Sequence, residues 1–165
     1  GAIREFGRRY GIPLQHIKPH GALYMEAAKN EELSQWMVDT LQKTSSDAII
    51  FCMGISKTYE VATRLGHPVV REFYADRDYD DSGSIVFKRQ VARPDPEQIA
   101  DKCLRACKEG RVHTVEGNDI EIAFESICFH SDTPGALEIG RAIRERLIEN
   151  GITIAPAATV LEQSR

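Results

Sequence analysis

The sequence lacks several patterns that would indicate a function directly. It has no apolar run near the ~20 residues of a membrane-crossing helix, no GxxxxGK[ST] loop for nucleotide phosphates and no CxxC pair. It also has no excess of basic residues, because 21 Lys and Arg are set against 25 Asp and Glu, a formal net charge of −4. General nucleic-acid binding relies on a basic face. We therefore expect neither a nucleic acid nor a membrane as partner.

The four cysteines are spaced too irregularly for a disulfide or metal framework. Cys52 and Cys128 lie in apolar segments, whereas Cys103 and Cys107 are four positions apart in a segment of helical periodicity. Free thiols buried in a reducing compartment are the simplest interpretation. We therefore expect a cytoplasmic protein.

What the sequence does contain is an alternation of strand and helix patterns. The expected strands cover residues 15–18, 48–53, 69–75, 126–130 and 152–156. Hairpins are expected at 111–122 and around 85–87. Repeated β-α units imply a parallel sheet, because parallel neighbours need crossover helices. At 165 residues, either a complete doubly wound sheet or part of a (β/α) barrel of ~250 residues satisfies the pattern.

Helix boundaries are marked by capping residues. Asp95 is expected to cap one helix, with Pro96 in its first turn. Asn30 is expected to cap another, whose inward stripe is predicted as Leu33, Trp36, Met37, Thr40 and Leu41. Asp132 or Thr133 is a candidate cap for a helix at 134–149.

The two ends of the chain carry weaker signals. Residues 2–10 are typical of the end of a helix that stops at Gly11. A domain rarely starts within a helix, so we expect that the front of the protein is missing or encoded elsewhere. We expect one incomplete domain over residues 1–156 and a C-terminal tail at 157–165.

Polar and titratable side chains collect at or just beyond the ends of the expected strands. They are Lys18, His20, Tyr24, Glu72, Asp76, Arg77, Tyr79, His130 and Asp132. In either architecture, the carboxyl ends of parallel strands form the ligand-binding edge. The sequence therefore predicts an active site at this edge.

The residue types suggest roles within that site. His20 and His130 are suited to moving protons near neutral pH. Asp132, Asp76 or Glu72 would orient a histidine or act as a base on water, and the choice among them stays open.

Positively charged side chains and a metal ion are the other candidate components of this site, beside the histidines and carboxylates. Lys18 and Arg77 are suited to holding a substrate carboxylate. A His/Asp edge also suits a divalent metal, but the His-x-Asp spacing at 130–132 does not identify one, so the metal stays unknown.

Three segments together resemble a known family. "HIKPHGALY" (16–24), "EFYADRDY" (72–79) and "CFHSDTPGA" (128–136) are similar, in order and spacing, to the LamB/YcsF family, the A-type subunits of the prokaryotic 5-oxoprolinase. The resemblance covers about residues 1–156. It implies a distorted (β/α) barrel of the glycoside hydrolase/deacetylase type, here a partial barrel with N-terminal strands missing. It also implies catalytic roles for His20, His130 and the carboxylates, and substrate contacts from Lys18, Tyr24, Arg77 and Tyr79.

The resemblance implies an activity as well. The family takes part in the ATP-dependent opening of 5-oxo-L-proline to L-glutamate, with ATP handled by two partner subunits, which fits the missing phosphate loop. The chain departs from the family at Ser131, where glycine is usual, and in lacking the "NxDxGE", "ACGFHAGD" and "GAHPxYPD" motifs. Two alternatives stay open: a metal-dependent sugar deacetylase or hydrolase of the same barrel superfamily, and a non-catalytic remnant or assembly subunit.

Overall fold

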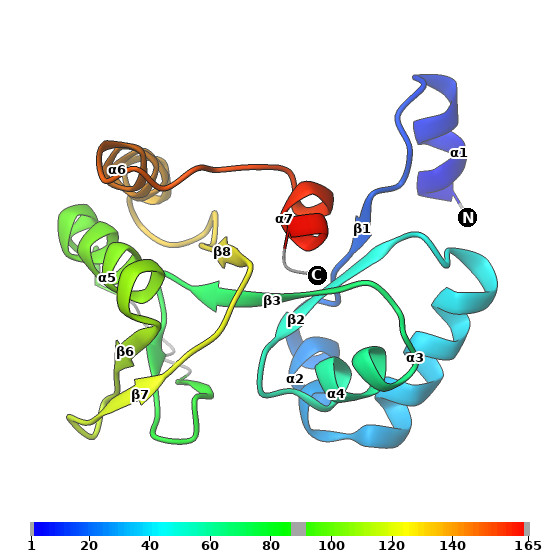
Figure 1. Ribbon diagram of the computed structural model, residues 1–165, viewed down its shortest axis with the longest axis horizontal. Helices are drawn as coiled ribbons and strands as arrows, with labels where there is room; N and C mark the ends of the chain where they lie inside the picture. Colours follow the sequence, from blue (N-terminus) through cyan, green and yellow to red (C-terminus); the bar gives the residue numbers. More distant parts are fainter. Residues whose placement is uncertain (1, 87–91, 164–165) are drawn as a thin grey trace. The chain divides into compact units, whose positions relative to one another are not determined.

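The computed structural model describes residues 2–86 and 92–163, and it contains a four-stranded parallel sheet. The strands are β1 (His16–Ile17), β2 (Ile49–Met53), β3 (Val69–Tyr74) and β8 (Ser126–Cys128), in the order β1-β2-β3-β8 (Figure 1). β1 pairs with β2 in parallel, and β3 pairs with β8 in parallel. These strands follow chain order without the reversal of a doubly wound sheet. The predicted parallel α/β class is confirmed, and the order is consistent with a partial barrel.

The chain forms two compact units, Gly1–Val70 and Arg71–Arg165, and the division falls inside β3. Each unit has its own helices and its own buried apolar side chains. The predicted domain limits at 1–156 stay a prediction.

The first unit packs three helices around β2. Besides α1 (Ala2–Arg9), it contains α2 (Gly21–Lys29), α3 (Glu31–Thr44) and α4 (Lys57–Arg64), and the last three contact one another (Figure 1). β2 is an apolar strand, as the sequence predicts for a strand covered on both faces. Its side chains join helix residues in a cluster of Val38, Ile50, Cys52, Val61 and Ala62.

The inward face of α3 differs from the prediction. Asn30 caps the helix as expected, accepting a hydrogen bond from Leu33 N at 3.0 Å. However, Ser34 and Val38 are the buried residues, and Trp36 is 60% exposed. The hydroxyl of Ser34 donates to a backbone carbonyl of α2 and contacts a threonine of α4, so a small satisfied polar side chain takes a buried position. Leu33, Met37 and Leu41 of the predicted stripe are partly buried, and Leu41 packs against the cluster around β2.

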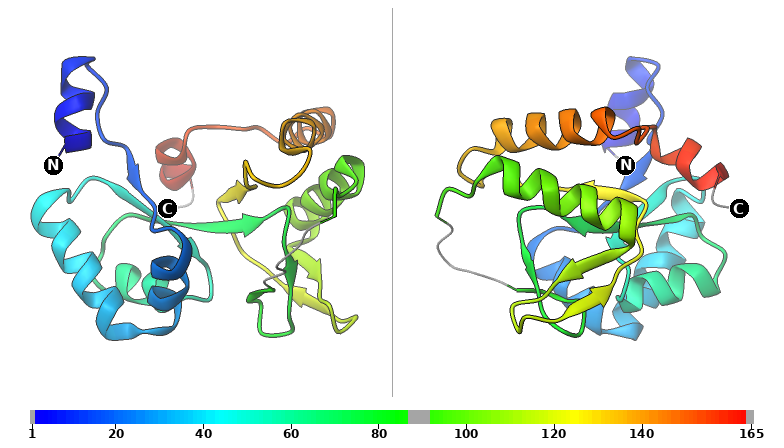
Figure 2. Two further views of the ribbon diagram at one scale, coloured as in Figure 1. Left: turned by 180° about the vertical axis from the view of Figure 1, so that it is seen from behind. Right: turned by 60° about the vertical axis from the view of Figure 1, so that its left-hand side comes forward.

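The second unit combines two antiparallel hairpins with two long helices. The hairpins are β4 (Asp78–Tyr79) with β5 (Ile85–Val86), and β6 (Arg111–His113) with β7 (Asp119–Glu121). The helices are α5 (Pro96–Glu109) and α6 (Ala136–Glu149), which run side by side (Figure 2). Both predicted hairpins are confirmed, although Phe87, predicted in the smaller one, lies outside the described residues.

Two predictions for the C-terminal part are wrong. The helix predicted at 134–149 begins at Ala136 after Gly135, whose φ of +82° suits glycine, so neither Asp132 nor Thr133 is its cap. No strand forms at 152–156, because an apolar alternating run becomes a strand only where a neighbour pairs with it, and Ile152 N instead donates to Leu147 O of α6. The predicted tail contains a helix, α7 (Ala157–Gln163).

The cap of α5 provides a test of the fold, because this helix carries a residue of the site described below. Asp95 accepts a hydrogen bond from Glu97 N at 2.9 Å. We expect Asp95→Ala to lower the free energy of unfolding by about 1 kcal/mol, and Asp95→Asn, which keeps a capping oxygen, to change it little. Urea denaturation followed by circular dichroism measures both. An equal loss in the two variants would contradict the cap.

Candidate active site at the carboxyl end of β3

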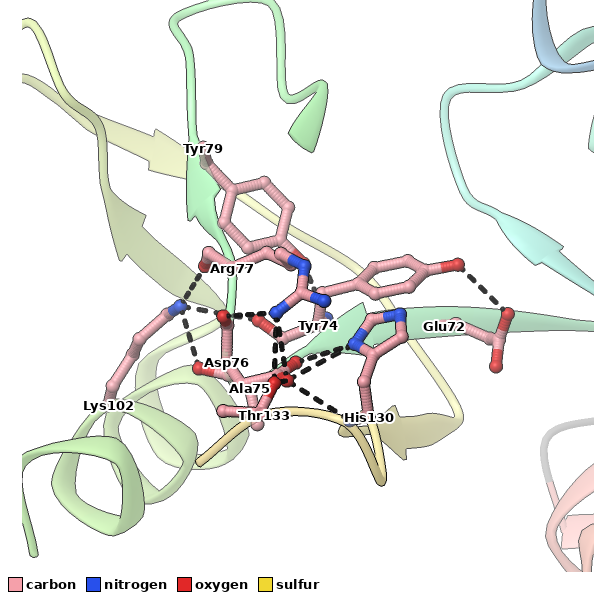
Figure 3. Close-up of polar contacts among 9 residues, drawn as sticks. All are labelled: Glu72, Tyr74, Ala75, Asp76, Arg77, Tyr79, Lys102, His130 and Thr133. Carbon is pink, nitrogen blue, oxygen red and sulfur yellow. Dashed lines mark hydrogen bonds and ion pairs between the residues drawn. The ribbon is translucent and has the colours of Figure 1, made fainter. Parts of the chain in front are cut away.

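The centre of the candidate site is a buried carboxylate. Asp76 follows β3 closely, and its side chain is fully buried. Its oxygens accept hydrogen bonds from His130 N, His130 Nδ1, Thr133 Oγ1 and Arg77 Nη1 (Figure 3). A carboxylate offers about four lone-pair positions. Three of these donors bond to Oδ2 and His130 Nδ1 bonds to Oδ1, so both oxygens of the buried carboxylate have partners.

Strand register explains why Asp76 and His130 meet. β3 and β8 are parallel, with Tyr74 opposite Cys128. Continuing that register by two residues places position 130 opposite position 76, on the same face of the sheet. His130 Nδ1 lies 2.9 Å from Asp76 Oδ1, and His130 N lies 3.0 Å from Asp76 Oδ2. The sequence predicted both residues, and the fold brings them into contact.

Thr133 and Arg77 complete the shell around the carboxylate. Thr133 is buried and donates its hydroxyl to Asp76 Oδ2 at 2.5 Å. Arg77 Nη1 lies 3.0 Å from Asp76 Oδ2 and 3.2 Å from Thr133 Oγ1. The sequence suggested Thr133 only as a helix cap, and the pattern "HSDT" gave no signal that its hydroxyl turns back toward β3.

These contacts set the protonation state of Asp76. Burial raises the pKa of the carboxyl group, but the hydrogen bonds from Thr133 and His130 and the charge of His130 outweigh it. The pKa of Asp76 therefore lies below its ordinary value of 3.8, and the carboxylate is ionised at neutral pH.

The ionised carboxylate orients the histidine. When Asp76 accepts from Nδ1–H, the imidazole is in the tautomer that leaves the lone pair on Nε2. The His130 side chain is 34% exposed, so part of the ring is open to solvent. A histidine held by a buried carboxylate in this way has the geometry that a general base requires.

Glu72 and Tyr74 extend the site along the same face of β3, since alternate strand residues share a face. Tyr74 OH donates to Glu72 Oε2 at 3.1 Å, and the Tyr74 ring stacks against His130 with centroids 5.9 Å apart (Figure 3). Glu72 is buried, and the structure links it to the histidine through Tyr74. The sequence predicted Glu72 but missed Tyr74, although the period-two spacing of Glu72, Tyr74 and Asp76 indicates it.

Two other predicted residues have different surroundings. Asp132 is exposed, beside the buried Thr133. Tyr79 is 1% exposed, and its hydroxyl accepts a hydrogen bond from Tyr74 N at 2.6 Å. Burial is the main cause that raises the pKa of Tyr79. Tyr79 therefore stabilises the backbone of β3. Its burial does not favour the predicted contact with a substrate.

The remaining predicted residues belong to the first unit. Lys18 Nζ lies 5.9 Å from the ring centroid of Tyr24, which is buried. His20 is exposed and immediately precedes α2, where Gly21, with φ of +58°, lets the chain turn into the helix. Roles for Lys18, His20 and Tyr24 stay predictions.

Sequence reasoning missed one charged residue near the site. Lys102 lies on α5, and its Nζ donates to the backbone carbonyls of Tyr74, Ala75 and Arg77 (Figure 3). The sequence contained one indication of this position: Lys102 directly precedes Cys103, a residue expected to face inward. A lysine beside an inward-facing residue is often partly buried.

A pocket of about 530 Å³ adjoins the same strand end. Its walls include Asp76, Arg77, Asp78, Gln98 and Lys102. Within the part of the chain that the structure describes, no group of three or more His, Cys, Asp or Glu residues is arranged to hold a metal ion. Over the same residues, no helix has the length and apolarity to cross a bilayer.

The fold and the site together define an α/β protein with a histidine–carboxylate pair at the carboxyl end of its parallel strands. Comparison with known proteins is consistent with this class. The LamB/YcsF family pattern matches residues 1–162, and the chain belongs to that family.

Individual relatives show the same affiliation. The chain is 58% identical over 154 residues to the A-type subunit, numbered 1, of the 5-oxoprolinase of Pseudomonas aeruginosa, covering 93% of this chain and 61% of the relative. It is 35% identical to the A-type subunit of the 5-oxoprolinase of Coprothermobacter proteolyticus, covering 98% of this chain and 63% of that protein. The chain thus spans less than two thirds of these relatives.

A solved structure supports the fold. The crystal structure of a lactam utilization protein from Thermus thermophilus superposes with a TM-score of 0.84 at 30% identity, covering 93% of this chain and 62% of that one. The partial (β/α) barrel predicted from the sequence is in keeping with this similarity.

The shell around Asp76 can be tested by removing one donor. Thr133→Val keeps the shape of the side chain but removes the hydroxyl. A hydrogen bond to a charged group contributes about 1.5–3 kcal/mol, so we expect a loss of that size in the free energy of unfolding at pH 7, measured by urea denaturation.

The pH dependence has a defined sign. The folded pKa of Asp76 lies below its unfolded value, so its contribution to stability is complete above about pH 3.8 and is lost as the pH falls through the folded pKa. The difference between Thr133→Val and the unmodified protein should therefore shrink below that pH. Thr133→Ser, which retains the hydroxyl and loses only the methyl group, is the control and should be destabilised less. A Thr133→Val variant as stable as the unmodified protein would contradict the contribution of this hydrogen bond.

Proposed function

We propose that the chain acts as a component of a cytoplasmic, ATP-dependent 5-oxoprolinase, in the place of its A-type subunit. In this proposal it carries the hydrolytic opening of 5-oxo-L-proline to L-glutamate, and partner subunits handle ATP. One observation carries the proposal: a buried, ionised Asp76 orients His130 in a chain that is 58% identical to a protein named as a 5-oxoprolinase subunit. Because the chain spans 61% of that relative, the complete reaction and its partners belong to the proposal.

The proposed chemistry is addition of water to an unreactive cyclic amide. The lactam carbonyl is a poor electrophile, and activation of its oxygen with ATP is the work assigned to the partners. His130 Nε2 removes a proton from water as its oxygen bonds to the carbonyl carbon. The C–N bond then breaks, and the same proton is returned to the departing ring nitrogen, with no net change in the histidine. The phosphoryl group that ATP placed on the carbonyl oxygen leaves as phosphate when a second water adds, and L-glutamate is then free.

Asp76 has the orienting role in this scheme. Its side chain is fully buried and both of its oxygens have donors, so it is badly placed to take a proton from water itself. Its negative charge stabilises the imidazolium that forms when His130 accepts the proton, as a buried carboxylate does in hydrolytic triads. This assigns the base to His130 and leaves Asp132 and Glu72 without a proton-transfer step.

Arg77 is the proposed partner of the substrate carboxylate. The contacts of its guanidinium with Asp76 and Thr133 involve Nη1, and a guanidinium has further N–H donors in the same plane. Arg77 also lines the pocket beside the site. A planar fork of donors suits a carboxylate better than an ammonium does.

A matched pair of histidine variants tests the proposal. His130→Gln removes the base while keeping a polar side chain of similar length, and we expect kcat for glutamate release to fall by ~10²-fold or more. His113→Gln is the control, because His113 is exposed on β6 and its ring contacts Asp119. Glutamate is measured after incubation with 5-oxo-L-proline, ATP and the partner subunits, with the Pseudomonas aeruginosa relative as positive control.

The outcomes separate the parts of the proposal. Turnover by this chain that is lost in His130→Gln and kept in His113→Gln supports it. Equal rates in His130→Gln and the unmodified chain exclude His130 as the base. If the relative is active and this chain is not, the chain alone is not a complete catalytic component.

A further inference from the structure

A lysine of α5 donates hydrogen bonds to the backbone carbonyls at the end of β3. Lys102 Nζ lies 3.2 Å from Tyr74 O, 3.0 Å from Ala75 O and 2.5 Å from Arg77 O. These three carbonyls flank Asp76 on both sides along the chain. The ammonium therefore bonds to the stretch of backbone that presents the central carboxylate of the site (Figure 3).

The number of donors matches the number of acceptors. A lysine ammonium has three N–H donors and no acceptor, and here three carbonyls receive them. A neutral amine has two N–H groups and a lone pair, and that lone pair would face the third carbonyl. The observed contacts thus specify the charged form of Lys102.

The surroundings hold the ammonium in place. Its Nζ lies 5.3 Å from the ring centroid of Phe73 and 5.3 Å from that of Tyr79, within the range of cation–π attraction. Both rings are buried and stack on each other, with centroids 5.5 Å apart. The lysine is therefore built into the support of β3, whereas His130 and Thr133 contact Asp76 itself.

We propose that Lys102 is a positioning residue: by holding the carbonyls of Tyr74, Ala75 and Arg77 it fixes the direction of the Asp76 carboxylate, and through it the ring of His130. As far as catalysis is concerned, this inference rests on the proposed function. The described hydrogen bonds of Lys102 go to backbone carbonyls, so the lysine acts on His130 only through the backbone and Asp76. A displacement of about 1 Å at a catalytic group can cost ~10²-fold in rate, so such a support affects turnover as well as stability.

The charge of Lys102 is adjustable in an accessible pH range. Burial is the main cause that lowers its pKa, to about 8, and the charges of Asp78 and Asp76 oppose that shift. Cys103 lies on the same helix and its own pKa is raised, chiefly by burial, to about 12, so it is a neutral thiol near pH 8. Tyr79, on β4, likewise has a raised pKa and stays neutral. The acidic side chains that act on Lys102 are thus those of Asp76 and Asp78, and the Arg77 guanidinium is paired to Asp76.

The first test reads the backbone directly and needs no turnover. Carbonyl ¹³C NMR shifts of Tyr74, Ala75 and Arg77 are followed from about pH 6 to about pH 10 in the intact 165-residue chain. We expect the three to change together with a midpoint of about 8, the pKa of Lys102. Carbonyl shifts that stay constant over this range would overturn the proposal.

Two variants sharpen this measurement. Lys102→Met keeps the length of the side chain but removes all three donors, so the transition should disappear. Lys108→Met is the matched control on the same helix, because Lys108 is exposed and bonds to Asn150 Oδ1 at 3.0 Å. It should keep the transition. A transition that persists in Lys102→Met belongs to another group and also overturns the proposal.

The second test concerns catalysis. Lys102→Met should lower kcat for glutamate release by ~10- to 10²-fold with little change in KM, and the unmodified protein should lose kcat as the pH rises through about 8. Lys102→Arg keeps the charge and should restore part of kcat and move the alkaline loss to higher pH. An unchanged kcat in Lys102→Met overturns the positioning role.

The two tests fail in distinguishable ways. If the unmodified chain and its partners release no glutamate, the proposed function fails, and the NMR titration still decides whether Lys102 holds the β3 end. If Lys102→Met does not fold, the titration of the unmodified chain and the Lys102→Arg variant decide instead.

Discussion

The buried carboxylate of Asp76 is the constraint on which the rest of the site depends. An ionised group removed from water is strongly destabilising unless donors replace the lost hydration. Here the donors come from the residue that follows, Arg77, and from the loop after β8, His130 and Thr133. One charge therefore fixes the conformation of the segment that follows each of two strands, and it does so only if β3 and β8 are in register. The geometry of the Asp76–His130 pair and the packing of these strand ends are consequences of the same requirement.

That requirement also explains what the sequence could and could not predict. The strands, the hairpins and the caps at Asn30 and Asp95 depend on local patterns, and, apart from the strand at 152–156, these predictions are confirmed. Asp76 and His130 could be placed at one edge because parallel strands end on the same side of a sheet. Whether Thr133 turns toward a helix or toward a carboxylate depends on a partner 57 positions away, and no local pattern contains that information.

The other errors have the same origin. The inward face of α3 includes Ser34, whose hydroxyl is satisfied by residues of two other helices, so hydrophobicity alone shifts the predicted face toward the exposed Trp36 and Thr40. The segment at 152–156 has the composition of a strand, but a strand also needs a neighbour with which to pair. Lys102 looks like an ordinary helix lysine until β3 is placed beside it. In each case the deciding interaction joins segments that are distant in sequence.

Lys102 and Asp76, the charged groups at the end of β3, are each satisfied by other partners and form no direct ion pair among the described contacts. The described hydrogen bonds of Lys102 Nζ go to backbone carbonyls, whereas the Asp76 carboxylate receives its donors from His130, Thr133 and Arg77. A direct lysine–carboxylate pair would compete with the imidazole for the carboxylate lone pairs and weaken its hold on Nδ1. By satisfying the lysine with peptide groups, the fold supports Asp76 through its backbone and leaves Oδ1 of the carboxylate bonded to His130 Nδ1. Supporting the backbone and orienting His130 thus depend on separate sets of hydrogen bonds.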